Sequence, residues 1–405
     1  MAKRVKSVEL FLAVGLAATI GACRGEVANN PQEPSNPTPA PAELPAEAGD
    51  SGEGGEGGEG GEGGGSAATQ NLNWANTFND DQVIAGFANQ VIIPKYQQYV
   101  ETTVALRQAI DIFVQDSSQV NLVAVRQAWT ATRIAWEQTE TFTFGPAGSL
   151  GFDGAMDSWP VNQTDIQQIL ASSDPLTAET VAQLPDTDRG MHTLEFLLFG
   201  EANDKTLDQF LDREKQYLQA LGADLNTLAQ GLLESWQQGV QGQPAYQTVL
   251  ATAGQPDNSI YPTTAAAAQE LVIGILDSLT EVGEEKLAAP FADQDITGLE
   301  SRFSFQTMND LKSNLKSAEN GYLGRFPEAG AQASRSLSTY IAAVDPALDQ
   351  TIKAQFAEAE SALAAVPTPL ETHLTNPAAA EEIEAAIAAI LQVKQTIETE
   401  VVPLI

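Results

Sequence analysis

The chain has 405 residues, 43% of them hydrophobic, and a formal net charge of -34 at pH 7. It is long enough to bury a large core, and its length favours two domains. Nucleic-acid phosphates are recognised by a basic face, which so acidic a chain does not offer. We therefore expect no nucleic-acid partner, and expect instead a metal ion or another cation.

The N-terminus is typical of an exported protein. A basic start is followed by a short apolar run at 10–20, which is the pattern of a secretory signal rather than of a membrane span. The run ends in Ile-Gly-Ala before Cys23, the only cysteine of the chain. Small residues before a cysteine resemble the processing site of bacterial lipoproteins. We predict a signal peptide at 1–22, a lipid anchor on Cys23, and a cell-envelope protein that faces the periplasm or the exterior.

Residues 23–70 are of low complexity. A part rich in proline and alanine is followed by a Gly-Gly-Glu repeat. Such a composition cannot bury enough apolar surface to fold. We interpret the segment as a disordered, self-repelling tether between the anchor and a folded body.

From residue 71 onward the apolar residues follow a helical period. A helix is expected up to about residue 116, with a kink or restart at Pro94. A second helix is expected at 120–141. The spacing places five of its residues on one face: Arg126, Trp129, Arg133, Trp136 and Glu140. Charged side chains between tryptophans are unusual for an apolar core.

A glycine-rich loop is expected at 142–162, and it contains Asp157 and Trp159. Long loops in compact domains are often functional. Short helices should follow at 165–172 and 178–182. Asp188 is the expected N-cap of the next helix, which Gly200 should end.

That next helix carries His192, one of only two histidines, with Glu195 three residues later. Residues three apart share a helix face, so both side chains can reach one metal ion. The alternative is a buried histidine that makes only hydrogen bonds.

The rest of the chain also favours helices. They are expected at 206–238, 264–287, 297–320, 334–344, 346–366 and 377–402, with a domain boundary at 239–258. No useful period-two pattern indicates strands. We predict an all-α protein of two tandem helical bundles, 71–245 and 259–405.

Four blocks resemble the imelysin-like family in sequence and in order. They are Ala-Trp-Glu-Gln-Thr-Glu at 135–140 with Phe-Gly-Pro at 144–146; Met-Asp-Ser-Trp-Pro at 156–160; Gly-Met-His-Thr-Leu-Glu at 190–195, continued to Gly200; and Ser-Arg-Phe-Ser at 301–304 with Thr307, Asp310, Asn314 and Gly-Tyr-Leu-Gly at 321–324. The resemblance extends from about residue 71 to the C-terminus. It implies two helical bundles that arose by duplication, a cleft between them, an envelope location and a link to iron supply.

The expected site is a metal centre in this cleft. We expect His192 and Glu195 as ligands, with Glu140 and Asp157 as further oxygen donors. Oxygen ligands with one imidazole suit iron, with zinc as the alternative, so the expected partner is iron or an iron-containing ligand. Six further side chains should surround the ligands or line the cleft: Arg133, Trp136, Glu137, Trp159, Arg302 and Asp310.

Two other functions remain open. The name-giving family member was described as a metallopeptidase, but this chain has no His-Glu-x-x-His motif, and its other histidine, His373, is far along the chain. We therefore favour a function other than catalysis, with a metallopeptidase as the alternative. The third possibility is a lipoprotein that binds a peptide or a siderophore without a metal. The sequence gives no sign of an oligomeric state.

Overall fold

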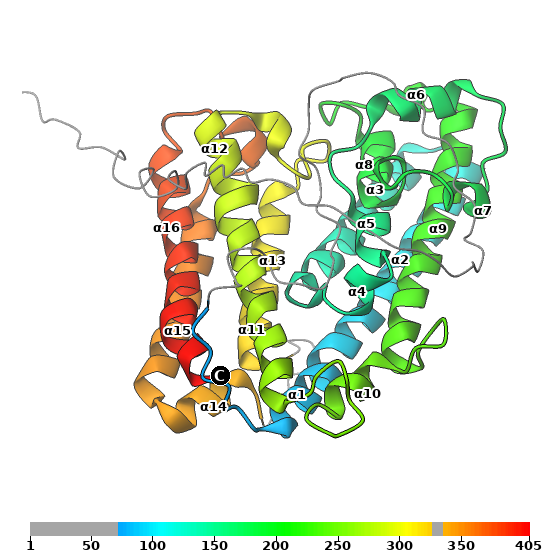
Figure 1. Ribbon diagram of the computed structural model, residues 1–405. Coiled ribbons are helices and arrows are strands. Elements are labelled where there is room, and N and C mark those ends of the chain that lie inside the picture. Colours follow the sequence, from blue (N-terminus) through cyan, green and yellow to red (C-terminus); the bar gives the residue numbers. More distant parts are fainter. Residues whose placement is uncertain (1–71, 326–334) are drawn as a thin grey trace, which may run out of the picture. The chain divides into compact units, whose positions relative to one another are not determined.

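The computed structural model of the chain describes residues 72–325 and 335–405 (Figure 1). The predicted signal peptide, Cys23 and the tether lie outside these residues. None of the elements in the described ranges is a β-strand, which confirms the all-α prediction. In the same ranges, no helix has both the length and the apolar character needed to span a membrane.

The first part of the fold is built around α2, which packs against α3 and α9. Smaller helices connect these three, and α8 lies against α3 and α9. The elements are α1 (Asp81–Phe87), η2 (Ala88–Ile92), α2 (Ile93–Gln115), α3 (Gln119–Glu137), η3 (Glu140–Phe142), α4 (Pro146–Ser149), α5 (Phe152–Asp157), α6 (Gln163–Ala171), α7 (Ala178–Val181), η4 (Asp186–Asp188), α8 (Gly190–Phe199), η5 (Leu207–Gln209), α9 (Asp212–Gln237) and α10 (Tyr246–Ala251).

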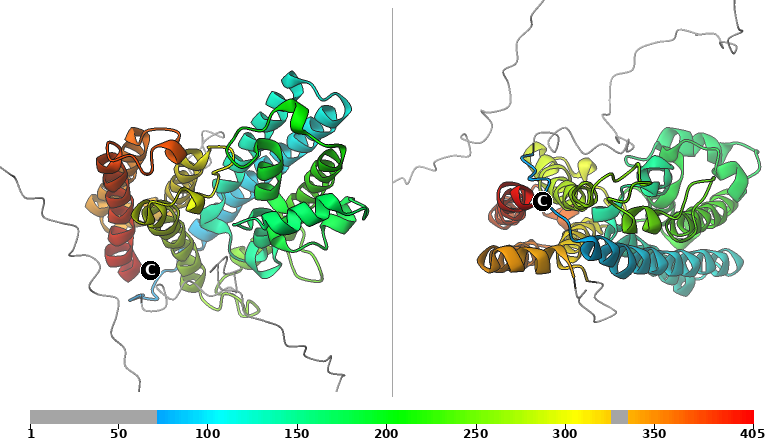
Figure 2. Two further views of the ribbon diagram at one scale, coloured as in Figure 1. Left: turned by 90° about the horizontal axis from the view of Figure 1, so that it is seen from above. Right: turned by 60° about the horizontal axis from the view of Figure 1, so that its bottom comes forward.

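In the second part, α15 and α16 lie side by side along their lengths, as Figures 1 and 2 show, and α11 packs against α13. The elements are α11 (Thr264–Thr280), η6 (Glu281–Ala288), α12 (Ala289–Asp293), η7 (Ile296–Gly298), α13 (Thr307–Leu323), α14 (Leu337–Val344), α15 (Pro346–Ala365), η9 (Leu370–Thr372), α16 (Ala380–Thr396), η10 (Ile397–Val401) and η11 (Val402–Leu404).

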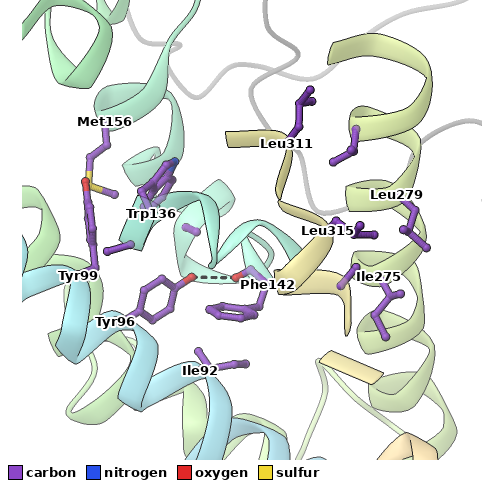
Figure 3. Close-up of a cluster of buried hydrophobic side chains, with 14 of the residues drawn as sticks. Ile92, Tyr96, Tyr99, Trp136, Phe142, Met156, Ile275, Leu279, Leu311 and Leu315 are labelled. Carbon is purple, nitrogen blue, oxygen red and sulfur yellow. Dashed lines mark hydrogen bonds between the residues drawn. The ribbon is translucent and has the colours of Figure 1, made fainter. Parts of the chain in front are cut away.

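A single hydrophobic cluster joins the two parts. Figure 3 shows part of it, where Tyr96 of α2 donates a 2.8 Å hydrogen bond to the carbonyl oxygen of Phe142. Side chains of α11 and α13, among them Ile275 and Leu315, complete the cluster. All described residues belong to one compact unit, so the boundary at 239–258 and the internal duplication stay predictions.

The helix restart predicted at Pro94 is confirmed, and it takes the form of a π-helical segment, η2, that ends two residues before the proline. The π segments η6 and η10 likewise end two residues before Pro290 and Pro403. A proline has no N–H to donate and clashes with the carbonyl four residues earlier. A local change of hydrogen-bond register relieves both problems without ending the helix.

Three local predictions were wrong. The predicted loop at 142–162 contains the short helices α4 and α5, separated by residues around Gly151, which has a positive φ. The predicted helix at 297–320 begins only at Thr307, because Phe305 has a φ of 61° that an α-helix does not allow. Arg189 rather than Asp188 is the N-cap of α8, and it makes no side-chain capping bond.

Candidate metal centre

Gly190 brings the first turn of α8 against the end of α5. Its φ is +77°, and a Cβ at this position would lie 2.5 Å from the carbonyl oxygen of Met156. Only a glycine allows both this backbone conformation and this close approach. As a result, His192 on α8 comes next to Asp157, the residue after Met156.

Glu195 holds the imidazole of His192 in place. Its Oε2 lies 3.1 Å from Nδ1 of His192. Its Oε1 accepts a 2.8 Å hydrogen bond from the backbone N–H of Ser304. Both side chains are fully buried. Each oxygen of Glu195 therefore has a protein partner, and the carboxylate fixes the orientation of the ring.

The other ring nitrogen of His192 faces two further carboxylates. Its Nε2 lies 3.2 Å from Oδ1 of Asp157 and 3.9 Å from Oε1 of Glu300. One candidate ligand atom from each of these three residues lies within 4.8 Å of the other two. Within the described part of the chain, this is the one group of histidine, cysteine and acidic side chains that is so arranged.

The arrangement fits a metal ion. Nε2 is buried and makes no hydrogen bond of good geometry with the described residues. One imidazole and two carboxylates suit iron and similar divalent ions. A metal-bound histidine usually donates its other N–H to a carboxylate or carbonyl, and Glu195 provides that acceptor here.

The guanidinium of Arg133, fully buried on α3, holds the carboxylates around the centre. It pairs with Asp157, lies 3.2 Å from Oε2 of Glu300, and lies 2.6 Å from Oε1 of Glu137. It also lies 3.4 Å from Oδ2 of Asp310. Arg133 therefore ties residues of α3, α5 and α13 to the turn at 299–306.

Neighbouring side chains add further contacts. The indole N–H of Trp136 donates a 2.7 Å hydrogen bond to Oδ2 of Asp157. The ring of Trp159 lies 4.9 Å from the imidazole of His192, centroid to centroid. The Arg302 guanidinium lies over the ring of Phe303 and pairs with Glu201. It therefore contacts an aromatic side chain beside the site and is not one of the groups around Nε2 of His192.

Glu140 belongs to a second acidic group. Its Oε2 lies 3.9 Å from Nζ of Lys286, a residue of η6. It is not part of the three-residue group at Nε2 of His192. The structure therefore brings Asp157 to the expected centre and places Glu140 in the neighbouring cluster around Lys286.

The pKa shifts reflect burial and this charge network. Burial opposes the charge on Asp157, but Arg133 and His192 hold the pKa of that carboxyl well below its usual range. For His192, burial acts in the other direction and lowers the pKa. The carboxylates of Asp157 and Glu195 outweigh this effect and raise the pKa of His192 to about 9. Burial and the charge of Glu281 raise the pKa of Glu140 well above its usual value.

Burial and the neighbouring charges of Asp157 and Glu281 raise the pKa of Asp153 to about 7. Around the site, buried carboxyl groups thus outnumber cationic side chains. A bound cation would relieve this imbalance, because unpaired buried charge is costly.

Sequence reasoning missed Glu300 and Lys286. Glu300 directly precedes the Ser-Arg-Phe-Ser block, but the expectation of a helix at 297–320 concealed the turn that carries it. Lys286 could have been noticed only as a single lysine directly after the glutamates of 281–285, in a chain with few basic residues.

Comparison with known proteins gives consistent results. A sequence model of the family described as imelysin matches residues 92–397. Iron-regulated protein A of Synechococcus elongatus is 40% identical over 325 residues, which cover 80% of this chain and 86% of that protein.

Two crystal structures share the fold. One is of a protein from Parabacteroides distasonis described as a candidate iron-regulated protein A precursor; it has a TM-score of 0.69 at 24% identity and covers 81% of this chain and 97% of its own. The other is of an imelysin-like protein from Psychrobacter arcticum, with a TM-score of 0.64 at 14% identity, covering 82% and 96%. The likeness to these two structures concerns the fold alone.

Proposed function

The chain belongs to the imelysin family, and from that premise we propose that it binds one divalent metal ion, iron by preference, and takes part in iron acquisition or handling in the cell envelope. The observation that carries the proposal is the buried Nε2 of His192, which faces Asp157 and Glu300 and makes no hydrogen bond of good geometry. The name of the Synechococcus relative supports the link to iron.

In this proposal Nε2 of His192, Asp157 and Glu300 are the ligands. Glu195, expected from the sequence as a ligand, instead accepts a hydrogen bond from Nδ1 and keeps Nε2 directed at the metal. Arg133 and Trp136 hold Asp157. A metal bound at Nε2 would replace the proton there, so proton release would accompany binding.

A peptidase is less well supported. It would need a carboxylate or imidazole free to activate a metal-bound water. The glutamate of the Gly-x-His-x-x-Glu motif is engaged at both oxygens, by His192 and by Ser304. If a peptide library were cleaved, and chelation stopped the cleavage, the non-enzymatic proposal would fail.

A siderophore-binding role is also less well supported. A surface cavity of about 410 Å³ lies beside Phe196. Its charged lining includes Glu201, Asp204 and Glu214, and its lysine, Lys205, is already paired with Glu214 at 2.7 Å. Such a lining does not favour an anionic iron chelate.

The direct test is metal content after anaerobic incubation with Fe²⁺, with Zn²⁺ as competitor. The wild-type protein should bind one Fe²⁺ per chain. His192→Ala, Asp157→Asn and Glu300→Gln should each lose it, whereas the exposed control Glu358→Gln should not. A wild-type protein that takes up no metal at micromolar concentration would contradict the proposal.

The location is tested separately. We propose that Cys23 carries the lipid that holds the protein at a bacterial membrane. Cys23→Ala should move the protein from the membrane fraction to the soluble fraction. Membrane association that persists in this variant would exclude lipidation at Cys23 as the anchor.

A further inference from the structure

Lys286 lies in a setting that resembles the coordination of a metal ion. Its ammonium group is surrounded by oxygen atoms from five elements or turns. They are Oε2 of Glu300 at 3.2 Å, Oε2 of Glu281 at 3.5 Å, Oδ1 of Asn314 at 3.5 Å, Oε2 of Glu137 at 3.6 Å and Oε2 of Glu140 at 3.9 Å. Hard cations such as Mn²⁺, Mg²⁺ and Ca²⁺ prefer shells of carboxylate and carbonyl oxygens.

Glu300 connects this shell to the metal centre. Its Oε1 lies 3.9 Å from Nε2 of His192, and its Oε2 lies 3.2 Å from Nζ of Lys286. One carboxylate thus presents an oxygen to each of two neighbouring cation positions. This is the arrangement of a carboxylate that bridges a pair of ions.

We propose that the ammonium group of Lys286 occupies the second position of a carboxylate-bridged pair and thereby keeps the centre mononuclear. The inference rests on the proposed metal centre at His192. The lysine supplies one positive charge on a flexible stem, where a second ion would supply two. Lys286 lies in the last turn of the π-helical segment η6.

When the ammonium group is removed, the oxygen shell should therefore bind another cation in its place. Glu137 is fully buried, and the side chains of Glu140 and Glu300 are only 11% and 13% exposed. Loss of one partner from a buried ion pair leaves uncompensated charge, which is costly. An added divalent ion is the direct replacement, and the space left by a shortened side chain admits it.

The test uses Mn²⁺ alone, added to the full-length wild type, Lys286→Ala and the control Lys353→Ala. Lys353 pairs with Asp349, at 2.7 Å, outside the Lys286 shell. We expect one Mn²⁺ in the wild type and in Lys353→Ala, and two in Lys286→Ala. Electron paramagnetic resonance should show an exchange-coupled pair in Lys286→Ala, and Glu300→Gln added to that variant should remove the coupling.

A second variant keeps the test decisive if Lys286→Ala folds poorly. Lys286→Gln retains a hydrogen-bond donor and removes only the charge. It should hold one Mn²⁺ about tenfold more tightly than the wild type, because a nearby like charge is lost.

The two proposals fail differently. A wild type that binds no Mn²⁺ and no Fe²⁺ contradicts the metal centre itself. A wild type that binds one ion, together with Lys286→Ala that also binds one and Lys286→Gln with unchanged affinity, contradicts only the role of Lys286. Two ions in the wild type would also overturn that role.

Discussion

Gly190 controls the distance between α8 and α5, and so the distance between His192 and Asp157. Gly190→Ala should destabilise the protein by about 2 kcal/mol or more, since it combines an unfavourable φ with a clash against the Met156 carbonyl. Metal affinity should fall as well. Chemical denaturation and metal titration measure the two effects.

Gly151 provides the matched control. Its φ is +70°, but a Cβ there would meet no atom within 4 Å. Gly151→Ala should therefore cost only about 1 kcal/mol, the conformational part of the effect, and leave metal affinity unchanged. Equal losses in the two variants would show that the contact with Met156 is unimportant.

Glu195→Gln separates an orienting carboxylate from a ligand. If Glu195 only positions the imidazole, metal affinity should fall by about 10–100-fold, which is typical for the hydrogen-bond partner of a metal-bound histidine. His192→Ala should abolish binding. Isothermal titration with Mn²⁺ measures both, and complete loss of binding in Glu195→Gln would instead identify it as a ligand.

Asp188, which is not one of the three candidate ligands, should make the stability of the fold depend on pH. Burial raises its pKa from 3.8 to about 6. The folded state therefore binds this proton more tightly than the unfolded state, and stability falls as the pH rises from about 4 to 6.

Asp188→Asn should remove this effect. We expect stabilisation of about 1 kcal/mol at pH 7, allowing for partial solvent screening, and little change at pH 4. Urea denaturation at both pH values checks the sign. A variant that is more strongly stabilised at pH 4 than at pH 7 would contradict the shift.

At the scale of elements, glycines allow α11 and α13 to approach η3. A Cβ on Gly274 would overlap the carbonyl oxygen of Thr141, and one on Gly321 would lie 2.8 Å from the Thr141 methyl group. Glycine to alanine within a helix normally stabilises by about 0.5–1 kcal/mol. Gly274→Ala should instead destabilise the protein by about 2 kcal/mol, as a thermal melt would show.

Gly222 in α9 is the control for that substitution. Its nearest neighbour would be the end of the flexible Ile110 side chain, at 2.7 Å. Gly222→Ala should be close to neutral because this methyl group can move aside. If both variants behaved alike, the close backbone contact at Thr141 would not be what requires a glycine at position 274.

The sequence allowed prediction of features that depend on near neighbours. The helical period identified α2, α3, α8 and α9 with small errors at their ends, and the three-residue spacing placed His192 beside Glu195. Nothing in the amino-acid composition indicates the positive φ of Phe305. The sequence therefore predicted a helix where the structure has the turn before α13. Glu300 therefore could not be recognised, because its contact with His192 joins residues far apart in the sequence.

At the scale of the whole molecule, the candidate metal centre links the two parts of the fold. Asp157 and His192 come from the first part, and Glu300 comes from the turn between η7 and α13. The beginning of the first described segment also meets the C-terminal residue, since the backbone N–H groups of Thr77 and Phe78 donate to the carbonyl oxygen of Ile405. A ligand at the centre should therefore stabilise both parts together.

Metal at 100 times its dissociation constant should stabilise the wild type by about 2.7 kcal/mol, a shift of a few degrees in Tm. Both parts should melt in one transition with or without metal. Glu300→Gln should lose the shift, and so should His192→Ala. A shift that survived in both variants would place the stabilising ion elsewhere.

The division of the ligands along the chain has a consequence for when the ion can be acquired. While the chain is being synthesised, Asp157 and His192 emerge well before Glu300, so the complete set of proposed ligands does not exist until most of the protein has appeared. Proteins take the metals that their surroundings supply as well as those they bind most tightly. Under the proposed function, the compartment in which this chain finishes folding would therefore select the metal that it binds.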